Sequence, residues 1–206
     1  MPETIQTKSA RNEARRIIRE KNGIIRTNQA LKAGIHPRTL YELRDQGELE
    51  QVSRGVFRLN ELAPISNPDL VTVALRIPKA VVCLISALAF HDLTTQVPHD
   101  VSIALEKGAQ SPRIEHPPVA IHRFSKKAFT AGIETHQIDN VDIRLYSPEK
   151  TLADCFKFRN KLGMEVILEA LKLYRSRRQF KSDELLKYAR VCRVEKVMTP
   201  YLEASL

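Results

Sequence analysis

Residues 27–59 constrain the fold more than any other stretch, because they predict two short helices, a tight turn and a hairpin in immediate succession. The first helix begins at Thr27 or Asn28, since both residue types cap helices well. It ends at Gly34, because glycine readily takes the left-handed conformation that follows a helix. Only a tight turn fits between this glycine and the next helical segment.

The second helix spans residues 37–46. Pro37 suits its first position, because the fixed φ of proline matches a helix and its missing amide is not needed there. Leu40 and Leu43 lie three residues apart on one face and predict a buried stripe. Arg38 begins the polar side chains of the opposite face, which is therefore expected to face outward.

A β-hairpin follows this helix. The runs 49–52 and 56–59 are rich in Val, Leu and Phe and flank Ser53-Arg54-Gly55, a pattern typical of a hairpin. Helix, turn, helix and hairpin together predict a winged helix-turn-helix. In that arrangement the second helix enters the major groove of double-stranded DNA, and the hairpin, or wing, meets phosphate.

The predicted DNA contacts lie on the second helix and on the wing. Arg38 is the first candidate for base reading, because arginine pairs bidentately with guanine, although a phosphate contact or a simple surface position also fits it. Tyr41 either touches a thymine methyl group or a phosphate, or packs under the wing. Thr39 and Arg44, at the edges of the buried stripe, suit phosphate contacts, as does Arg54 at the wing tip.

A further helix is expected over residues 9–22, before the stop at Gly23. Arg11, Arg15 and Arg19 recur every four residues on one of its faces. They either follow DNA phosphates or form a solvated face with acidic partners on the same helix. Asn28, near the start of the next helix, either hydrogen-bonds phosphate or caps that helix.

The chain of 206 residues is too long for this small domain alone. We expect one domain over residues 1–62 and a second over residues 65–206, joined near Pro64. The second domain is predicted to combine a small mixed β-sheet with several helices, so the fold class is α+β. Its strands are expected at 80–83, 101–105, 119–124, 133–138 and 141–146, and its helices at 67–77, 86–92, 148–163, 165–174, 182–190 and 195–204.

The charge of the chain is uneven. The net charge is +9, with 12 Lys and Arg against 7 Asp and Glu in residues 1–60, and 13 against 8 in residues 147–206. Two basic ends suggest acidic partners, although surplus lysine and arginine also aid solubility.

Three cysteines, Cys83, Cys155 and Cys192, lie far apart without metal-binding spacing. They are expected to be buried thiols in a reducing cytoplasm. The sequence shows no signal peptide, and its longest apolar run, residues 80–90, is too short to cross a bilayer. We therefore expect a cytoplasmic protein without membrane contact.

No catalytic or metal site and no cofactor are expected. Asp139 and Asp142 flank a turn with the spacing of a solvated loop, and the histidines form no metal-binding motif. Pro98-His99-Asp100 followed by Glu106-Lys107 faintly resembles a nuclease set, but lacks the residue between Glu106 and Lys107 that would place both side chains on one strand face. Ser147 and Lys150 are spaced as Ser-x-x-Lys, for which a helix cap is the better interpretation.

Two stretches carry a family resemblance. The sequence GIHPRTLYELRDQGELEQVSRGVFRL resembles the winged helix of the AbiEi-type antitoxins of type IV toxin–antitoxin systems. The later sequence LYSPEKTLADCFKFRNKLG is similar to the hallmark stretch of their C-terminal domain. Val56-Phe57 departs from the family, whose members often carry tyrosine in the second wing strand, but the hairpin prediction is unaffected.

The resemblance implies two roles. The N-terminal domain would repress the promoter of its own operon, usually at inverted repeats, where a homodimer is one arrangement. The C-terminal domain would counteract a nucleotidyltransferase-like toxin, often without a long-lived complex, so direct contact with the toxin stays open. The family transfers no catalytic residue. The alternative is a stand-alone transcription regulator whose C-terminal domain dimerises or senses a ligand.

Overall fold

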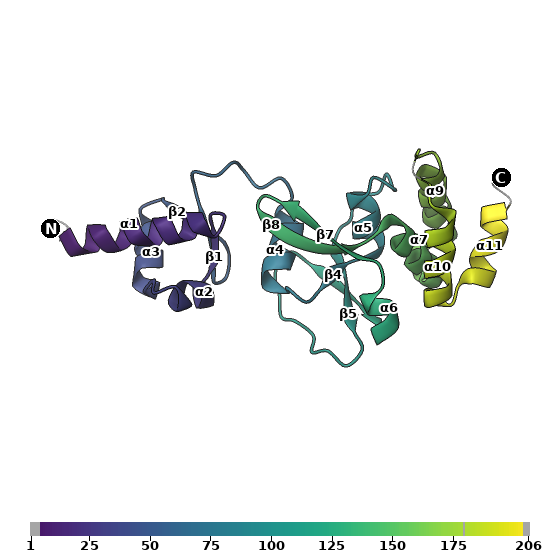
Figure 1. Ribbon diagram of the computed structural model, residues 1–206, viewed down its shortest axis with the longest axis horizontal. Coiled ribbons are helices and arrows are strands. Elements are labelled where there is room, and N and C mark those ends of the chain that lie inside the picture. Colours follow the sequence, from purple (N-terminus) through teal and green to yellow (C-terminus); the bar gives the residue numbers. More distant parts are fainter. Residues whose placement is uncertain (1–4, 179, 204–206) are drawn as a thin grey trace. The chain divides into compact units, whose positions relative to one another are not determined.

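A computed structural model describes residues 5–178 and 180–203 of the chain (Figure 1). Within these ranges the chain forms helices and two separate β-sheets, which confirms the predicted α+β class. The chain divides into two compact units. The N-terminal unit runs to Pro68 and includes residues 138–141, and the C-terminal unit holds the other residues from Asp69 onward.

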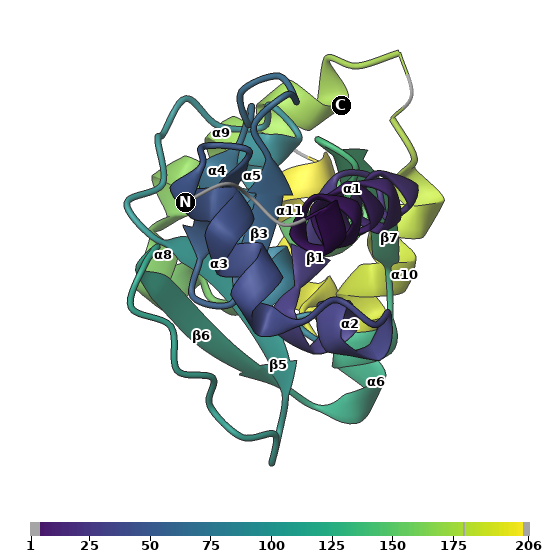
Figure 2. The same ribbon diagram turned by 90° about the vertical axis from the view of Figure 1, so that its left-hand side faces the viewer.

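The N-terminal unit contains the predicted helix-turn-helix and hairpin (Figure 2). A third strand joins the hairpin, because residues 24–26 pair antiparallel with the second wing strand. The strand order is β1-β3-β2. The first helix begins four residues earlier than predicted. The elements are α1 (Ile5–Glu20), β1 (Ile24–Arg26), α2 (Thr27–Lys32), α3 (Pro37–Asp45), β2 (Leu49–Ser53) and β3 (Val56–Leu59).

The start of α2 differs from the prediction, because neither Thr27 nor Asn28 caps the helix. Arg26 occupies the cap position, and its amide donates to Oε1 of Gln29 at 3.1 Å. The amide and hydroxyl of Thr27 instead donate to the carbonyl of Gly55, at 2.9 and 3.3 Å. The first residue of α2 is therefore tied to the wing turn.

Helix α3 begins at Pro37, as predicted. The residue before it supplies the cap, since Nδ1 of His36 accepts a hydrogen bond from the amide of Arg38 at 3.2 Å. Gly47 follows the helix with a φ of +74°. An L-residue with a side chain adopts that conformation only with strain, which explains why glycine ends this helix.

A compact core holds the helices of the N-terminal unit against its sheet. Leu40 and Leu43 are 1% and 0% exposed, so the predicted buried stripe of α3 is confirmed. Burying a side chain of this size contributes about 1.5–3 kcal/mol. The other members of this core are Ala14, Ile18, Ile25, Ala30, Ile35, Leu49, Phe57 and Leu59.

The C-terminal unit is built on a five-stranded sheet of order β6-β5-β4-β8-β7. The sheet is mixed, as predicted. Strand β4 pairs antiparallel with β5 and parallel with β8, while β5 and β6 are parallel. Residues 107–118 connect that parallel pair without a helix. The strands are β4 (Val81–Val82), β5 (Val101–Glu106), β6 (Val119–Phe124), β7 (Ile133–Ile138) and β8 (Val141–Tyr146).

Helices α9, α10 and α11 pack around α7 (Figure 1). The predicted helix from residue 148 to 163 is wrong in one respect, because Phe158 leaves helical geometry and divides it into α7 and α8. Helix α6 was not predicted, and α5 begins two residues before its predicted start. The helices are α4 (Pro68–Arg76), α5 (Leu84–Phe90), α6 (Lys126–Thr130), α7 (Pro148–Lys157), α8 (Arg159–Leu162), α9 (Met164–Arg175), α10 (Ser182–Cys192) and α11 (Glu195–Glu203).

All three cysteines are buried free thiols, as predicted. Burial raises the pKa of each, because the interior disfavours the charged thiolate. The thiols of Cys83, Cys155 and Cys192 are therefore protonated at neutral pH.

Candidate nucleic-acid interface

The outward face of α3 carries the first predicted contact, Arg38. Its side chain is 82% exposed, and its Nε donates to Oε1 of Glu42 at 2.9 Å. Among the described residues Glu42 is the hydrogen-bond partner of that guanidinium, and Nη1 and Nη2 remain available to an outside acceptor. A guanidinium held at Nε presents two parallel donors, the geometry that guanine O6 and N7 accept.

Tyr41 and Arg44 lie further along the same helix. The ring of Tyr41 meets Phe57 of the wing edge-on, at 5.8 Å between centroids, yet remains 45% exposed. Tyr41 therefore packs against the wing, the second of its two predicted roles, while part of its side chain stays exposed. The guanidinium of Arg44 lies 5.0 Å from that ring and donates twice to Asp45, at 2.9 and 2.7 Å. A phosphate contact by Arg44 would compete with this carboxylate.

The wing tip presents Arg54 as an exposed residue. The adjoining Gly55 has a φ of +73° and is held by Thr27 at the start of α2. Asn28 is exposed on the first turn of α2, whereas Thr39 is half-buried. Arg54, Asn28 and Thr39 thus lie in the same compact unit, on the wing turn, on α2 and on α3 respectively.

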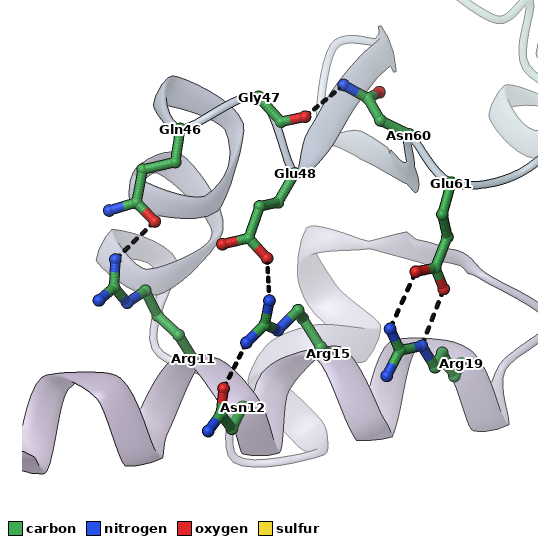
Figure 3. A network of polar contacts seen from close by, with 9 residues as sticks. All are labelled: Arg11, Asn12, Arg15, Arg19, Gln46, Gly47, Glu48, Asn60 and Glu61. Carbon is green, nitrogen blue, oxygen red and sulfur yellow. Dashed lines mark hydrogen bonds and ion pairs between the residues drawn. The ribbon is translucent and has the colours of Figure 1, made fainter.

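The arginine row of α1 has protein partners that the sequence did not reveal (Figure 3). Arg15 pairs with Glu48 and Asn12, and Arg11 donates to Gln46 at 2.5 Å. Figure 3 shows these side chains rising from one face of α1 toward the turn that follows α3. The guanidinium groups of the row are therefore engaged by partners within the protein, although the side chains of Arg15 and Arg19 are still 33% and 57% exposed.

Arg19 completes the row. Its Nε and Nη2 donate to the two carboxylate oxygens of Glu61 at 2.8 and 2.9 Å. These bonds lower the pKa of Glu61, because they favour its charged form. The acidic residues of α1 itself, Glu13 and Glu20, pair with Arg16 instead of with the row.

Sequence reasoning missed the distant partners of the row, namely Gln46, Glu48 and Glu61. They lie at least 33 residues from the arginines that they hold or support in α1. Periodicity along one helix reveals which residues share a face, but not which distant residues meet that face. The sequence did predict a turn at Gly47. The carboxylate of Glu48, directly after that glycine, was the available sign of a partner for an arginine.

Helix α7 contributes most of its side chains to the interior of the C-terminal unit. Lys150 and Asp154 are both 0% exposed, and Nζ lies 2.5 Å from Oδ2. The ammonium also lies 4.0 Å from the ring centroid of Tyr146, and the thiol of Cys192 donates to Asp154 at 3.1 Å. Ser147 accepts from the amide of Lys150 at 3.2 Å, which confirms the helix cap as the reason for their spacing.

No group of three or more His, Cys, Asp or Glu side chains is placed to bind a metal ion within residues 5–178 and 180–203. In the same part of the chain, none of the helices has the length and apolar character needed to cross a membrane.

Three helices, a tight turn and a three-stranded sheet that includes the wing hairpin give the N-terminal unit a winged helix-turn-helix fold, which is typical of DNA-binding proteins. Residues 12–60 match the family described as "Transcriptional regulator, AbiEi antitoxin". This match confirms the predicted resemblance to the AbiEi antitoxins over the winged helix.

The whole chain is similar in fold to the Rv2827c protein from Mycobacterium tuberculosis, known from a crystal structure. The TM-score is 0.52 and the sequence identity 14%, and the match covers 98% of this chain and 83% of that one. The likeness concerns the fold alone at this identity. No curated protein matches the sequence.

Proposed function

We propose that this chain is an antitoxin and transcriptional autorepressor that binds its own promoter through the winged helix. The observation that carries the proposal is α3, whose Leu40 and Leu43 are sealed in the core while Arg38 points outward. The family match over residues 12–60 supports a regulatory role. The protein would act in the cytoplasm by binding rather than by catalysis.

In this proposal Arg38 and Tyr41 read bases in the major groove, and Arg54 contacts phosphate from the wing. Thr39 and Asn28 lie on the flanks of these residues and would bond phosphate. Arg44 would also contact phosphate, once its guanidinium releases the carboxylate of Asp45. Arg15 and Arg19 are left out of the contact set, because carboxylates of the same unit already engage them.

The test is binding to the DNA upstream of the gene, measured by gel shift for the wild type, Arg38→Ala and Arg54→Ala. We expect Arg38→Ala to weaken specific binding by about 1–3 kcal/mol and to relax the preference at one base pair. Arg54→Ala should weaken binding to all sequences and reduce the salt dependence by about one phosphate contact. Unchanged binding in both variants would remove this surface from the proposal.

The antitoxin role assigns the C-terminal unit to a nucleotidyltransferase-like toxin, with or without a lasting complex. Its support is the resemblance of residues 145–163 to the family's hallmark stretch. A stand-alone regulator with a dimerising or ligand-sensing C-terminal unit is the competing function. The neighbouring gene distinguishes the two, since a toxin of this class favours the antitoxin.

A further inference from the structure

The turn from Gln46 to Glu48 joins the recognition helix α3 to the wing strand β2. Its conformation therefore sets how the two elements proposed to face DNA lie relative to each other. Gly47 gives this turn a left-handed backbone, and the amide of Glu48 donates to the carbonyl of Leu43 at 2.9 Å.

Side chains from two other segments hold this turn (Figure 3). From α1, Arg11 and Arg15 bond the side chains of its first and last residues. Asn60, directly after β3, donates from Nδ2 to the carbonyl of Gly47 at 2.6 Å and from its amide to the carbonyl of Glu48 at 3.1 Å. The turn is thus fixed from both α1 and the end of the wing.

Arg19 extends this arrangement to the segment after β3. Its two bonds to Glu61 are parallel, and a bidentate pair of this kind fixes orientation as well as distance. The four-residue spacing of the row places all three guanidinium groups on one side of α1. One helix face therefore connects the end of α3, the beginning of β2 and the segment that follows β3.

The surroundings of the row argue against phosphate binding. Arg11 is only 6% exposed and is already bonded. The carboxylates that pair with Arg15 and Arg19 place negative charge directly beside them, and that charge repels a phosphate group. A phosphate could bind only after displacing these partners.

We propose that Arg11, Arg15 and Arg19 are positioning residues, which fix the angle between the recognition helix and the wing without touching DNA. The inference rests on the proposed DNA-binding function. The row then affects DNA affinity through the shape of the unit, so that exchanging the charges of one pair preserves affinity, whereas removing one partner lowers it.

A charge exchange at one pair tests this inference. Arg15→Glu, Glu48→Arg and the double variant are compared with the wild type for binding to the upstream DNA over a range of salt concentrations. Each single variant should bind about three- to tenfold more weakly, and the double variant should return to within about twofold of the wild type. A phosphate contact predicts the opposite for Glu48→Arg, because an added positive charge near DNA tightens binding.

Arg16 offers a matched control. It lies on α1 with the same charge, but pairs only with residues of its own helix among the described contacts. Arg15→Ala should weaken binding without changing the slope of the logarithm of the binding constant against the logarithm of the salt concentration. Arg16→Ala should bind like the wild type. A slope reduced by about 0.9 in Arg15→Ala, or a double variant that remains as weak as Arg15→Glu, overturns the inference.

Amide hydrogen exchange in the absence of DNA separates this inference from the proposed function. Absence of binding by the wild-type protein refutes the proposed function, and exchange then decides the positioning role. The amides of Glu48 and Asn60 should exchange faster in Arg15→Glu and return to wild-type rates in the double variant. Equal exchange in all four proteins overturns the positioning role.

Discussion

Glu42 determines which nitrogen atoms of Arg38 remain available to a base. It engages Nε at 2.9 Å and is itself 29% exposed, one turn further along α3. A partner at Nε restrains the rotation of the guanidinium, so that its two terminal nitrogens are presented together. Glu42 is therefore expected to sharpen the preference for guanine rather than to add affinity.

Two variants of Glu42 with the same charge change test this. Glu42→Gln keeps an oxygen that accepts from Nε, whereas Glu42→Ala removes it. Both lose a negative charge and should bind non-specific DNA more tightly. Only Glu42→Ala should lose discrimination at the contacted guanine, by about 1 kcal/mol, as measured on operators with each base pair changed in turn. Equal discrimination by the two variants would contradict the orienting role.

At the scale of single residues, the sequence predicted what periodicity and residue chemistry determine. The burial of Leu40 and Leu43 follows from their spacing, and the exposure of Arg38 follows from its place on the opposite face. The pairing of Arg15 with Glu48 could not be predicted, because two segments far apart in sequence meet there only after the unit has folded.

Helix α7 is unusual among the elements because it carries an ion pair in a fully buried position. Desolvation raises the pKa of Asp154, although the nearby Lys150 opposes this change. Removing one partner leaves the other charge in the interior without compensation, which typically costs about 3–5 kcal/mol. Replacing both with apolar residues avoids that penalty.

We therefore expect Asp154→Asn to destabilise the C-terminal unit by about 3–5 kcal/mol, and the double variant Lys150→Met/Asp154→Leu to destabilise it less. Urea unfolding monitored by circular dichroism measures both. Asp142→Asn is the matched control, since Asp142 is exposed and its replacement should change stability by less than about 0.5 kcal/mol. If the double variant is less stable than Asp154→Asn, this expectation is wrong, and the ion pair itself stabilises the folded unit.

Elements with strong local signals were the predictable ones. Helices α2 and α3 end near Gly34 and Gly47, and α7 begins with Ser147 and Pro148. The break at Phe158 has no glycine or proline to mark it, so the pattern predicted one continuous helix. Helix α6 is a single short turn of five residues, below the length at which apolar periodicity can be recognised.

The two units have separate hydrophobic cores, one around Leu40 and the other around Leu152. The proposed functions divide in the same way, with DNA binding in the first unit and toxin neutralisation in the second. The mixed character of the larger sheet was predictable from its strands and helices. Its strand order was not, because sequence order does not determine which strands are neighbours.

A separation of functions should therefore be possible. The double variant Arg38→Ala/Arg54→Ala is expected to lose repression of its promoter while still suppressing the growth arrest caused by the neighbouring toxin. Residues 65–206 alone should suppress that arrest as well. A reporter fused to the promoter measures repression, and colony formation under toxin expression measures neutralisation. If the folded fragment leaves growth arrest unchanged, the antitoxin assignment is wrong.

The edge-on contact of Tyr41 with Phe57 has an experimental consequence. Tyr41 is the only tyrosine among residues 1–68, and the chain contains no tryptophan. Ultraviolet emission from the winged helix therefore originates at one ring, which lies on the surface proposed to meet the operator. Tyr41→Trp would give the full-length protein a single indole at that position, so that a stacked base or a shifted wing could be followed as a change in fluorescence without any attached dye.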